Sequence, residues 1–162
     1  MFKRTFLSAC TLATAAVLGA CASTPPAPVS VVDTAARTPE LSTLSGLIQQ
    51  SGLAEQLRGA GPYTVFAPSN EAFKAVPAAT MAQLAADKEL LRSVLSFHVL
   101  PAKVTAAEVK NANAKTVQGA NVALSKAGSF VTVEDAVVLN ADVAASNGVV
   151  HVIDRVLMPP KK

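Results

Sequence analysis

The sequence contains little that could stack on a nucleic-acid base or a sugar ring. Among 162 residues there is no tryptophan, one tyrosine and six phenylalanines. The 14 Lys and Arg residues barely exceed the 11 Asp and Glu residues, and without Lys3 and Arg4 the balance is 12 to 11. With no basic stripe and few aromatic side chains, the composition argues against nucleic-acid binding. The lack of tryptophan argues against an aromatic sugar-binding platform.

Residues 1–20 have the layout of a secretory signal peptide. Two basic residues precede an apolar run, residues 6–18, which is too short to span a bilayer. The run ends in LGAC, residues 18–21, which resembles a bacterial lipobox. This resemblance implies cleavage before Cys21, a diacylglyceryl group on its thiol and acylation of the new amino end; two or three acyl chains anchor firmly at about 0.8 kcal/mol per buried methylene. The alternative is ordinary secretion of a soluble or periplasmic protein.

The residues after Cys21 suggest where the protein is held. Ala22 stands where aspartate would act as a retention signal, so resemblance to Gram-negative sorting signals favours the outer membrane. We expect residues 21–30 to be a lipidated cysteine followed by a proline-rich tether, which at about 3.1 Å per residue could hold a domain some 30 Å from the lipid. Residues 31–160 are enough for one domain and too few for two.

The cysteine count also limits the chemistry. Cys10 lies within the predicted signal peptide, and a lipidated Cys21 leaves no disulfide, no cysteine metal site and no thiol nucleophile. His151 and Asp154 are three positions apart on a predicted strand, so they point to opposite faces and do not share a metal ion. The two glycines of RGAGP, residues 58–62, do not make a phosphate loop. We therefore expect no metal and no cofactor.

The first half of the domain has helical periodicity. In residues 39–53 leucine and isoleucine recur at helical spacing, and Gly52 suits the helix end. A short second helical segment ends at the glycines of residues 59–61. Residues 79–100 are predicted to be helical in two pieces, with one face formed by Leu91, Val94, Leu95 and His98.

In the second half of the domain the apolar residues no longer recur at helical spacing. Short apolar runs alternate with turn residues, and hairpins are predicted at residues 119–121, 126–128 and 134–135. The last run, residues 148–160, is apolar on both faces and is predicted to be a strand covered on both, ended by its prolines. Helices followed by a meander of strands predict an α+β domain.

Three segments together resemble the motifs of the fasciclin domain family. They are TVFAPSNEAF (64–73), FHVLP (97–101) and NGVVHVIDRVLMP (147–159). The resemblance covers about residues 31–160 and implies a helical layer packed on a strongly bent β-sheet or sandwich. Phe97 stands where many members have tyrosine, so this chain lacks the hydroxyl on which any adhesion role of that tyrosine would depend. The motif residues, expected to be mainly structural, are Thr64, Phe66, Pro68, Ser69, Asn70, Phe73, Phe97, His98, Pro101, Asn147, Gly148, His151, Asp154, Leu157 and Pro159.

The junction at residues 67–70 is interpreted as a structural corner between a strand and a helix. Pro68 removes a backbone donor, so strand pairing cannot continue. Ser69 can cap the following helix, Phe73 faces the core and Pro77 ends the helix. The alternative is a hydrolase in which Ser69, His98 and Asp154 act as nucleophile, base and orienter. Because Ser69 lacks the Gly-x-Ser-x-Gly frame that exposes a nucleophile, we expect no catalytic site.

Two further motif positions have predicted structural roles. A buried imidazole needs partners for both ring nitrogens, and we expect His98 to bond polar atoms at the Ser69–Asn70 corner. Asn147 and Gly148 are expected to form a turn that delivers the last strand, with a glycine that tolerates a positive φ.

The resemblance implies adhesion or extracellular protein contacts rather than catalysis. We therefore expect a lipid-anchored, non-enzymatic module that contacts surface or matrix proteins or makes weak homophilic contacts. An alternative is a carrier of an apolar ligand such as a carotenoid or lipid, because some family members resemble carotenoid-binding proteins. Its groove would be lined by residues 103–109 and 124–133.

Overall fold

The computed structural model describes residues 29–159, so the predicted signal peptide, Cys21, most of the tether and Pro160 lie outside the described residues. Apart from strand β1 (Tyr63–Pro68), the part before residue 98 is helical. Its helices are α1 (Val31–Arg37), η1 (Pro39–Leu41), α2 (Ser42–Ser51), α3 (Ala54–Arg58), α4 (Asn70–Lys74), α5 (Ala78–Ala86) and α6 (Lys88–Phe97). The later part contains the strands β2 (Val99–Leu100), β3 (Ala112–Lys115), β4 (Asn121–Ala127), β5 (Phe130–Val133), β6 (Ala136–Ala145) and β7 (Gly148–Ile153). The predicted α+β class is confirmed.

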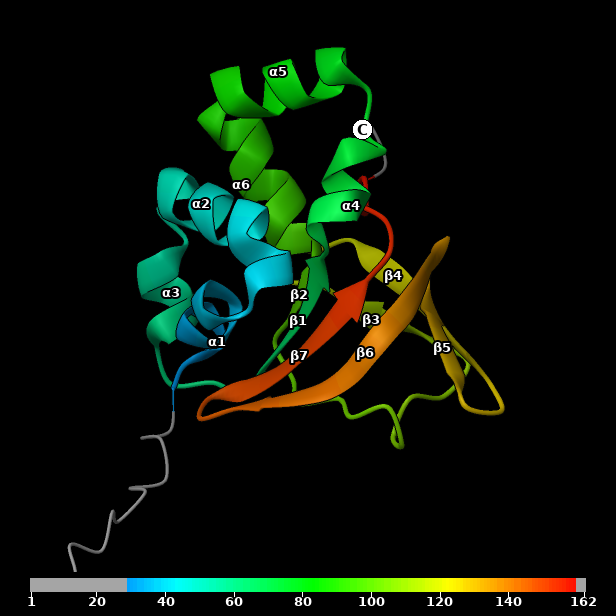
Figure 1. Cartoon of the computed structure of the whole chain (residues 1–162). Helices are drawn as coiled ribbons and strands as arrows, with labels where there is room; N and C mark the ends of the chain where they lie inside the picture. Colours follow the sequence, from blue (N-terminus) through cyan, green and yellow to red (C-terminus); the bar gives the residue numbers. More distant parts are fainter. Residues whose placement is uncertain (1–28, 160–162) are drawn as a thin grey trace, which may run out of the picture.

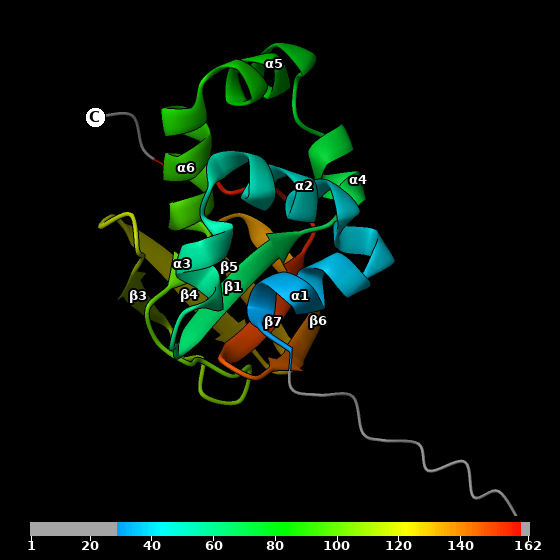
Figure 2. The ribbon, with the colours of Figure 1, turned by 90° about the vertical axis from the view of Figure 1, so that its left-hand side faces the viewer.

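The strands form one bent, seven-stranded sheet in the order β2-β1-β7-β6-β5-β4-β3. β1 and β7 pair in parallel, and every other neighbouring pair is antiparallel. The helices gather over β1 and β7, whereas β3, β4 and β5 curl away from them (Figure 1). The turned view places α1 in front of these two strands and α2 beside α4 and α6 (Figure 2). The expected helical layer on a bent sheet is therefore confirmed.

Two apolar clusters lie on opposite faces of β1 and β7. Val65, Val150 and Val152 pack with the helices in the first cluster. Phe66 and Ile153 pack inside the bent sheet in the second cluster. All six residues of β7 are buried, so the prediction of a strand covered on both faces is confirmed. Fully burying one such side chain contributes about 1.5–3 kcal/mol.

The structure corrects two element boundaries. β7 ends at Ile153 rather than at the prolines, because the Asp154 carboxylate accepts the Val137 N–H at 2.7 Å and the chain bends there. Residues 99–100 are strand β2, not the end of a helix, since they pair with the free edge of β1 in the register Val65↔Val99. No helix of the described range is long and apolar enough to cross a membrane.

The structure also adds a helix that the periodicity does not predict. In α1 the Ser30 hydroxyl accepts the Asp33 N–H at 3.2 Å as an N-cap, and Val31, Val32 and Ala35 are buried. Ser-x-x-Asp is a sequence signal for a helix start, and it is present at residues 30–33.

Candidate functional site

The three motif segments meet at one side of the sheet, where β2, β1 and β7 are adjacent strands. The first motif forms β1 and the last forms β7, and the two pair in parallel with Phe66 opposite His151. The rings of these two residues are stacked, with centroids 5.7 Å apart and planes at 23°. The central motif supplies β2 on the other side of β1, where Thr64 pairs with Leu100. The candidate site is this motif junction, and its polar side chains decide what it can do.

Ser69 caps helix α4, as predicted. Its Oγ accepts the Ala72 N–H at 3.2 Å, and its own N–H donates to the Ile153 carbonyl at 3.0 Å. The residue is only 6% exposed. Asn70 continues the corner, since its side chain accepts the Thr43 N–H at 3.1 Å and donates to the Pro39 carbonyl at 3.0 Å. The corner therefore ties β1 and α4 to β7 and α2.

The predicted partner of His98 is wrong. The imidazole does not bond Ser69 or Asn70; its Nδ1 lies 2.8 Å from the Val94 carbonyl, and its Nε2 accepts the Leu157 N–H at 2.9 Å. The side chain sits at the end of α6, so it reaches back one turn along its own helix and forward to the carboxyl-terminal segment. It is 2% exposed, and this burial lowers its pKa from 6.5 to about 4, against the opposing bond to Val94.

Thr64 and His151 hold the loop that follows β2. The Thr64 hydroxyl donates to the Ala102 carbonyl at 2.6 Å and accepts the Val104 N–H at 2.8 Å. His151 Nε2 lies 2.8 Å from the Val104 carbonyl, and its Nδ1 accepts the Asp142 N–H at 3.2 Å. Both side chains are buried, at 0% and 1% exposure. Their polar atoms are thus used inside the fold.

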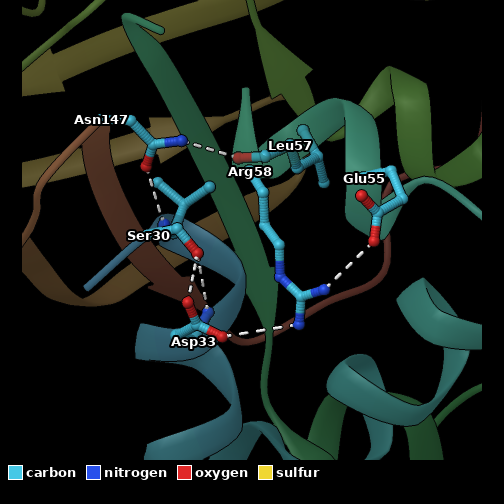
Figure 3. A network of polar contacts seen from close by, with 7 residues as sticks. Ser30, Asp33, Glu55, Leu57, Arg58 and Asn147 are labelled. Atoms are coloured by element: carbon cyan, nitrogen blue, oxygen red, sulfur yellow. Dashed lines mark hydrogen bonds and ion pairs between the residues drawn. The ribbon is translucent and has the colours of Figure 1, made fainter. Parts of the chain in front are cut away.

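Asn147 joins three segments that are far apart in the chain (Figure 3). Its Oδ1 accepts the Val31 N–H at 2.9 Å, and its Nδ2 donates to the carbonyls of Leu57 at 2.7 Å and Gly59 at 3.0 Å. Its backbone carbonyl accepts the Tyr63 N–H at 3.0 Å. This residue fixes the start of α1 and the end of α3 against the β6–β7 turn.

A charged network lies beside Asn147. Arg58 is 3.6 Å from Asp33 and 3.3 Å from Glu55, and the Ser30 hydroxyl donates to Asp33 at 2.8 Å. The bond from Ser30, together with the nearby Arg58 charge, lowers the pKa of Asp33. Because these ion pairs are about half exposed, they contribute little to stability.

Gly148 is required for a different reason from the predicted one. The turn is formed by Ser146 and Asn147, and Gly148 is instead the first residue of β7, with a φ that is not positive. A Cβ at this position would instead overlap the carbonyl oxygen of Tyr63 on the neighbouring strand. Close approach of two parallel strands, not left-handed backbone, excludes a side chain here.

The remaining motif residues range from buried to exposed. Phe73 is buried against the helices, and Phe97 and Leu157 are buried inside the bent sheet. Pro68 is the last residue of β1, Pro101 is exposed after β2, and Pro159 is half-buried. Phe97 carries no hydroxyl and is 2% exposed, so this position offers no polar group to a partner.

The structure contradicts the hydrolase arrangement that the sequence allowed. The Ser69 hydroxyl caps α4, His98 bonds Val94 and Leu157, and the Asp154 carboxylate bonds the Val137 N–H. The three side chains are therefore not joined as nucleophile, base and orienter. Between residues 29 and 159 there is also no group of three His, Cys, Asp or Glu side chains that could hold a metal ion.

The two segments expected to line an apolar groove contribute residues to one buried cluster. Val109 lies in the same buried cluster as Leu124, Val131 and Val133. The Lys126 Nζ also links the two segments, because it donates to the Ala106 carbonyl at 2.8 Å.

Comparison with known proteins gives consistent matches over most of the chain. The family model described as the fasciclin domain matches residues 39–159. Protein sll1483 of Synechocystis sp. is 41% identical over 134 residues, which cover 82% of this chain and 74% of that protein. Cell surface glycolipoprotein MPB83 of Mycobacterium bovis is 37% identical over 135 residues, covering 80% of this chain and 60% of that protein. A solved FAS1 domain pair from the insect cell adhesion molecule fasciclin I superposes with a TM-score of 0.62 at 26% identity, over 73% of this chain and 45% of that one.

Proposed function

Because the chain belongs to the fasciclin domain family, we propose that it is a lipid-anchored, non-enzymatic module that makes adhesive or other protein contacts at the cell envelope. Proteins with this domain include an insect cell adhesion molecule and a mycobacterial cell surface glycolipoprotein. Their names support a role in surface contacts. They also make a lipid anchor at Cys21 consistent with the family.

The observation that carries the proposal is the inward use of the motif side chains. Thr64, Ser69, His98 and His151 are all at most 6% exposed, and each bonds backbone groups of the same domain. A buried polar group that already has its partners is not free to bind a substrate. Contacts with other proteins would therefore be made by the outer surface.

The point where the tether meets the domain indicates which end would face the lipid. The Ser146 N–H donates to the Val29 carbonyl at 2.8 Å, so the chain enters beside the β6–β7 turn. Helix α4 lies at the opposite end of β7 (Figure 1). Residues 22–28 could span about 20 Å if extended. In this arrangement the α4 end is displayed away from an outer-membrane anchor in a Gram-negative envelope.

The anchor can be tested with the full chain and a Cys21→Ser variant in a Gram-negative host. We expect the wild-type protein in the outer-membrane fraction, with an intact mass that corresponds to an acylated amino terminus at Cys21. The variant should carry no acyl group at position 21. A wild-type protein that is soluble and unacylated would exclude the anchor.

The contact function can be tested by photo-crosslinking from two positions of the anchored protein. Leu139 on β6 is 62% exposed and lines a hollow together with Asn70 and Glu71 at the α4 end. Lys103 lies beside the β6–β7 turn and serves as the matched position near the anchor. We expect protein adducts, with other envelope proteins or with a second copy, chiefly from position 139. Equal and low adduct yields from both positions would count against the proposal.

A further inference from the structure

A shallow groove separates helix α4 from the carboxyl-terminal segment. Its volume is about 390 Å³, and it is open to solvent. One wall is formed by Ala72, Ala75, Val76 and Pro77, and the other by Arg155, Val156 and Met158. In Figure 1 the chain leaves the arrowhead of β7 and passes beside α4, which are the two sides of this groove. We call it the α4 groove.

The α4 groove is apolar except for one cation. Val156 and Met158 line it from the carboxyl-terminal segment, and Met158 is 44% exposed. Arg155 is the one charged residue among the described residues that line it. None of the ion pairs between residues 29 and 159 includes Arg155. An exposed, unpaired guanidinium at an apolar groove is complementary to an anionic group on an apolar body.

Both walls are held in place before any ligand arrives. The Ser69 cap fixes α4, and Pro77 ends that wall. On the other wall, Asp154 is bonded to Val137 and the Leu157 N–H is bonded to His98. Arg155 thus lies between two anchored positions. A site that is already ordered loses less conformational entropy on binding.

A second hollow on the far side of residues 155–158 provides a contrast. It encloses about 470 Å³ and is also lined by Arg155, but Glu134 and Asp135 lie at its rim. The Glu134 carboxylate already accepts the Ala123 N–H at 2.7 Å. Two carboxylates would repel an anion there. The α4 groove has no such acid in its lining and is therefore the side on which an anion fits.

We propose that the α4 groove binds a single-chain amphipathic carboxylate of the fatty-acid class. Its carboxylate pairs with the Arg155 guanidinium, and its alkyl chain lies on Val76 and Met158. This site is separate from the motif junction and from the segments 103–109 and 124–133. It does not depend on a lipid anchor or on adhesion, so its failure would leave the proposed function untouched.

The test uses the full chain with Cys21→Ser, which carries no acyl group of its own, and three ten-carbon probes below their micelle concentrations. Titration calorimetry or chemical-shift mapping compares decanoate, decanol and decyltrimethylammonium. We expect decanoate to bind at least tenfold more tightly than the ammonium probe, with shifts at Val76 and Met158. Arg155→Glu should weaken decanoate binding at least tenfold and leave decanol binding within twofold.

Two control variants make the result specific. Lys110→Glu changes the same charge on the loop after β2 and should leave decanoate binding unchanged. Asp135→Asn removes a carboxylate from the neighbouring hollow and should not weaken decanoate binding. Equal binding of the three probes, decanoate binding that survives Arg155→Glu, or no binding of decanoate as a monomer would each overturn the proposal. The exposed position of Arg155 means that its variant should keep the wild-type melting temperature.

Discussion

His98 Nε2 accepts a hydrogen bond from the Leu157 N–H, 59 positions further along the chain, at 2.9 Å. Its other ring nitrogen faces the Val94 carbonyl at 2.8 Å and must therefore carry the proton. Both nitrogens of a neutral imidazole are satisfied by backbone groups. The side chain joins the end of α6 to the carboxyl-terminal segment, and it has no free nitrogen for chemistry.

Replacing His98 with leucine should destabilise the domain by about 1–3 kcal/mol. The substitution leaves the buried Leu157 N–H without its acceptor, and an unpaired buried polar group costs about that much. Urea unfolding would measure the loss, and hydrogen exchange should show faster exchange of the Leu157 amide. Arg92→Leu, on the exposed side of the same helix, is the control and should change stability by less than about 0.5 kcal/mol. An unchanged midpoint for His98→Leu would contradict this role.

Stability should fall as the pH is lowered from about 6.5 toward 4. Burial lowers the pKa of His98 to about 4, so between these values the unfolded chain binds a proton that the folded chain does not. The part of the free energy of unfolding that comes from this lowered pKa is fully present above pH 6.5. About 2 kcal/mol of it should be lost between pH 7 and pH 5.

The measurement is urea unfolding at several pH values within that range. The pKa values of Asp33 and Glu108 are also lowered. Because the ordinary pKa of a carboxylate is about 4, the stability that these two groups contribute is lost mainly below about pH 5. His98→Leu should remove most of the dependence between pH 7 and 5. An equally steep pH dependence in that variant would assign the titration to another group.

Two threonine-to-valine substitutions should have opposite effects. Thr64 Oγ1 has two partners, Ala102 and Val104, so Thr64→Val should destabilise the domain by about 1–3 kcal/mol. Thr34 Oγ1 is the buried side-chain polar atom in residues 29–159 that has no partner, so Thr34→Val should stabilise it by up to about 1 kcal/mol. Thermal and urea unfolding of both variants would check the signs. Equal losses at the two positions would contradict the bonding pattern.

Two glycine-to-alanine substitutions provide a similar contrast. Gly148→Ala places a Cβ against the Tyr63 carbonyl, so β1 or β7 must shift, and we expect a loss above about 3 kcal/mol or failure to fold. Gly46 lies within α2, and a Cβ added there would have no other atom within 4 Å, so Gly46→Ala should gain up to about 1 kcal/mol. Circular dichroism and urea unfolding distinguish these outcomes. A Gly148→Ala protein as stable as the wild type would show that the strands are less tightly apposed.

The parts of the fold that follow from local sequence could be predicted. The strand-to-helix corner follows from Pro68 and Ser69, whose effects act within three residues. The burial of β7 on both faces follows from its continuous apolar run. Helix α1 also has a local signal, since Ser30 and Asp33 mark its start, but the helix is too short for its apolar residues to show a clear period.

The contacts between distant segments could not be predicted in the same way. The partner of His98 depends on where the Leu157 amide lies, and no periodicity in the chain gives that position. The same is true of Asn147, whose side chain bonds Val31, Leu57 and Gly59. The sequence shows a glycine at position 148, but the requirement for glycine follows from the close approach of β1 and β7. These contacts form only when the first and last motifs pair in parallel as β1 and β7.

The two histidines provide the most direct test of the central claim, that the motif side chains are internal ties. His98 must carry its proton on Nδ1, because that atom faces the Val94 carbonyl. His151 must carry it on Nε2, which faces the Val104 carbonyl, while its Nδ1 accepts the Asp142 N–H. Nitrogen NMR of the folded protein at about pH 7 should therefore show two neutral rings locked in opposite tautomers. Averaged nitrogen shifts from freely exchanging tautomers, or the same tautomer in both rings, would contradict the account.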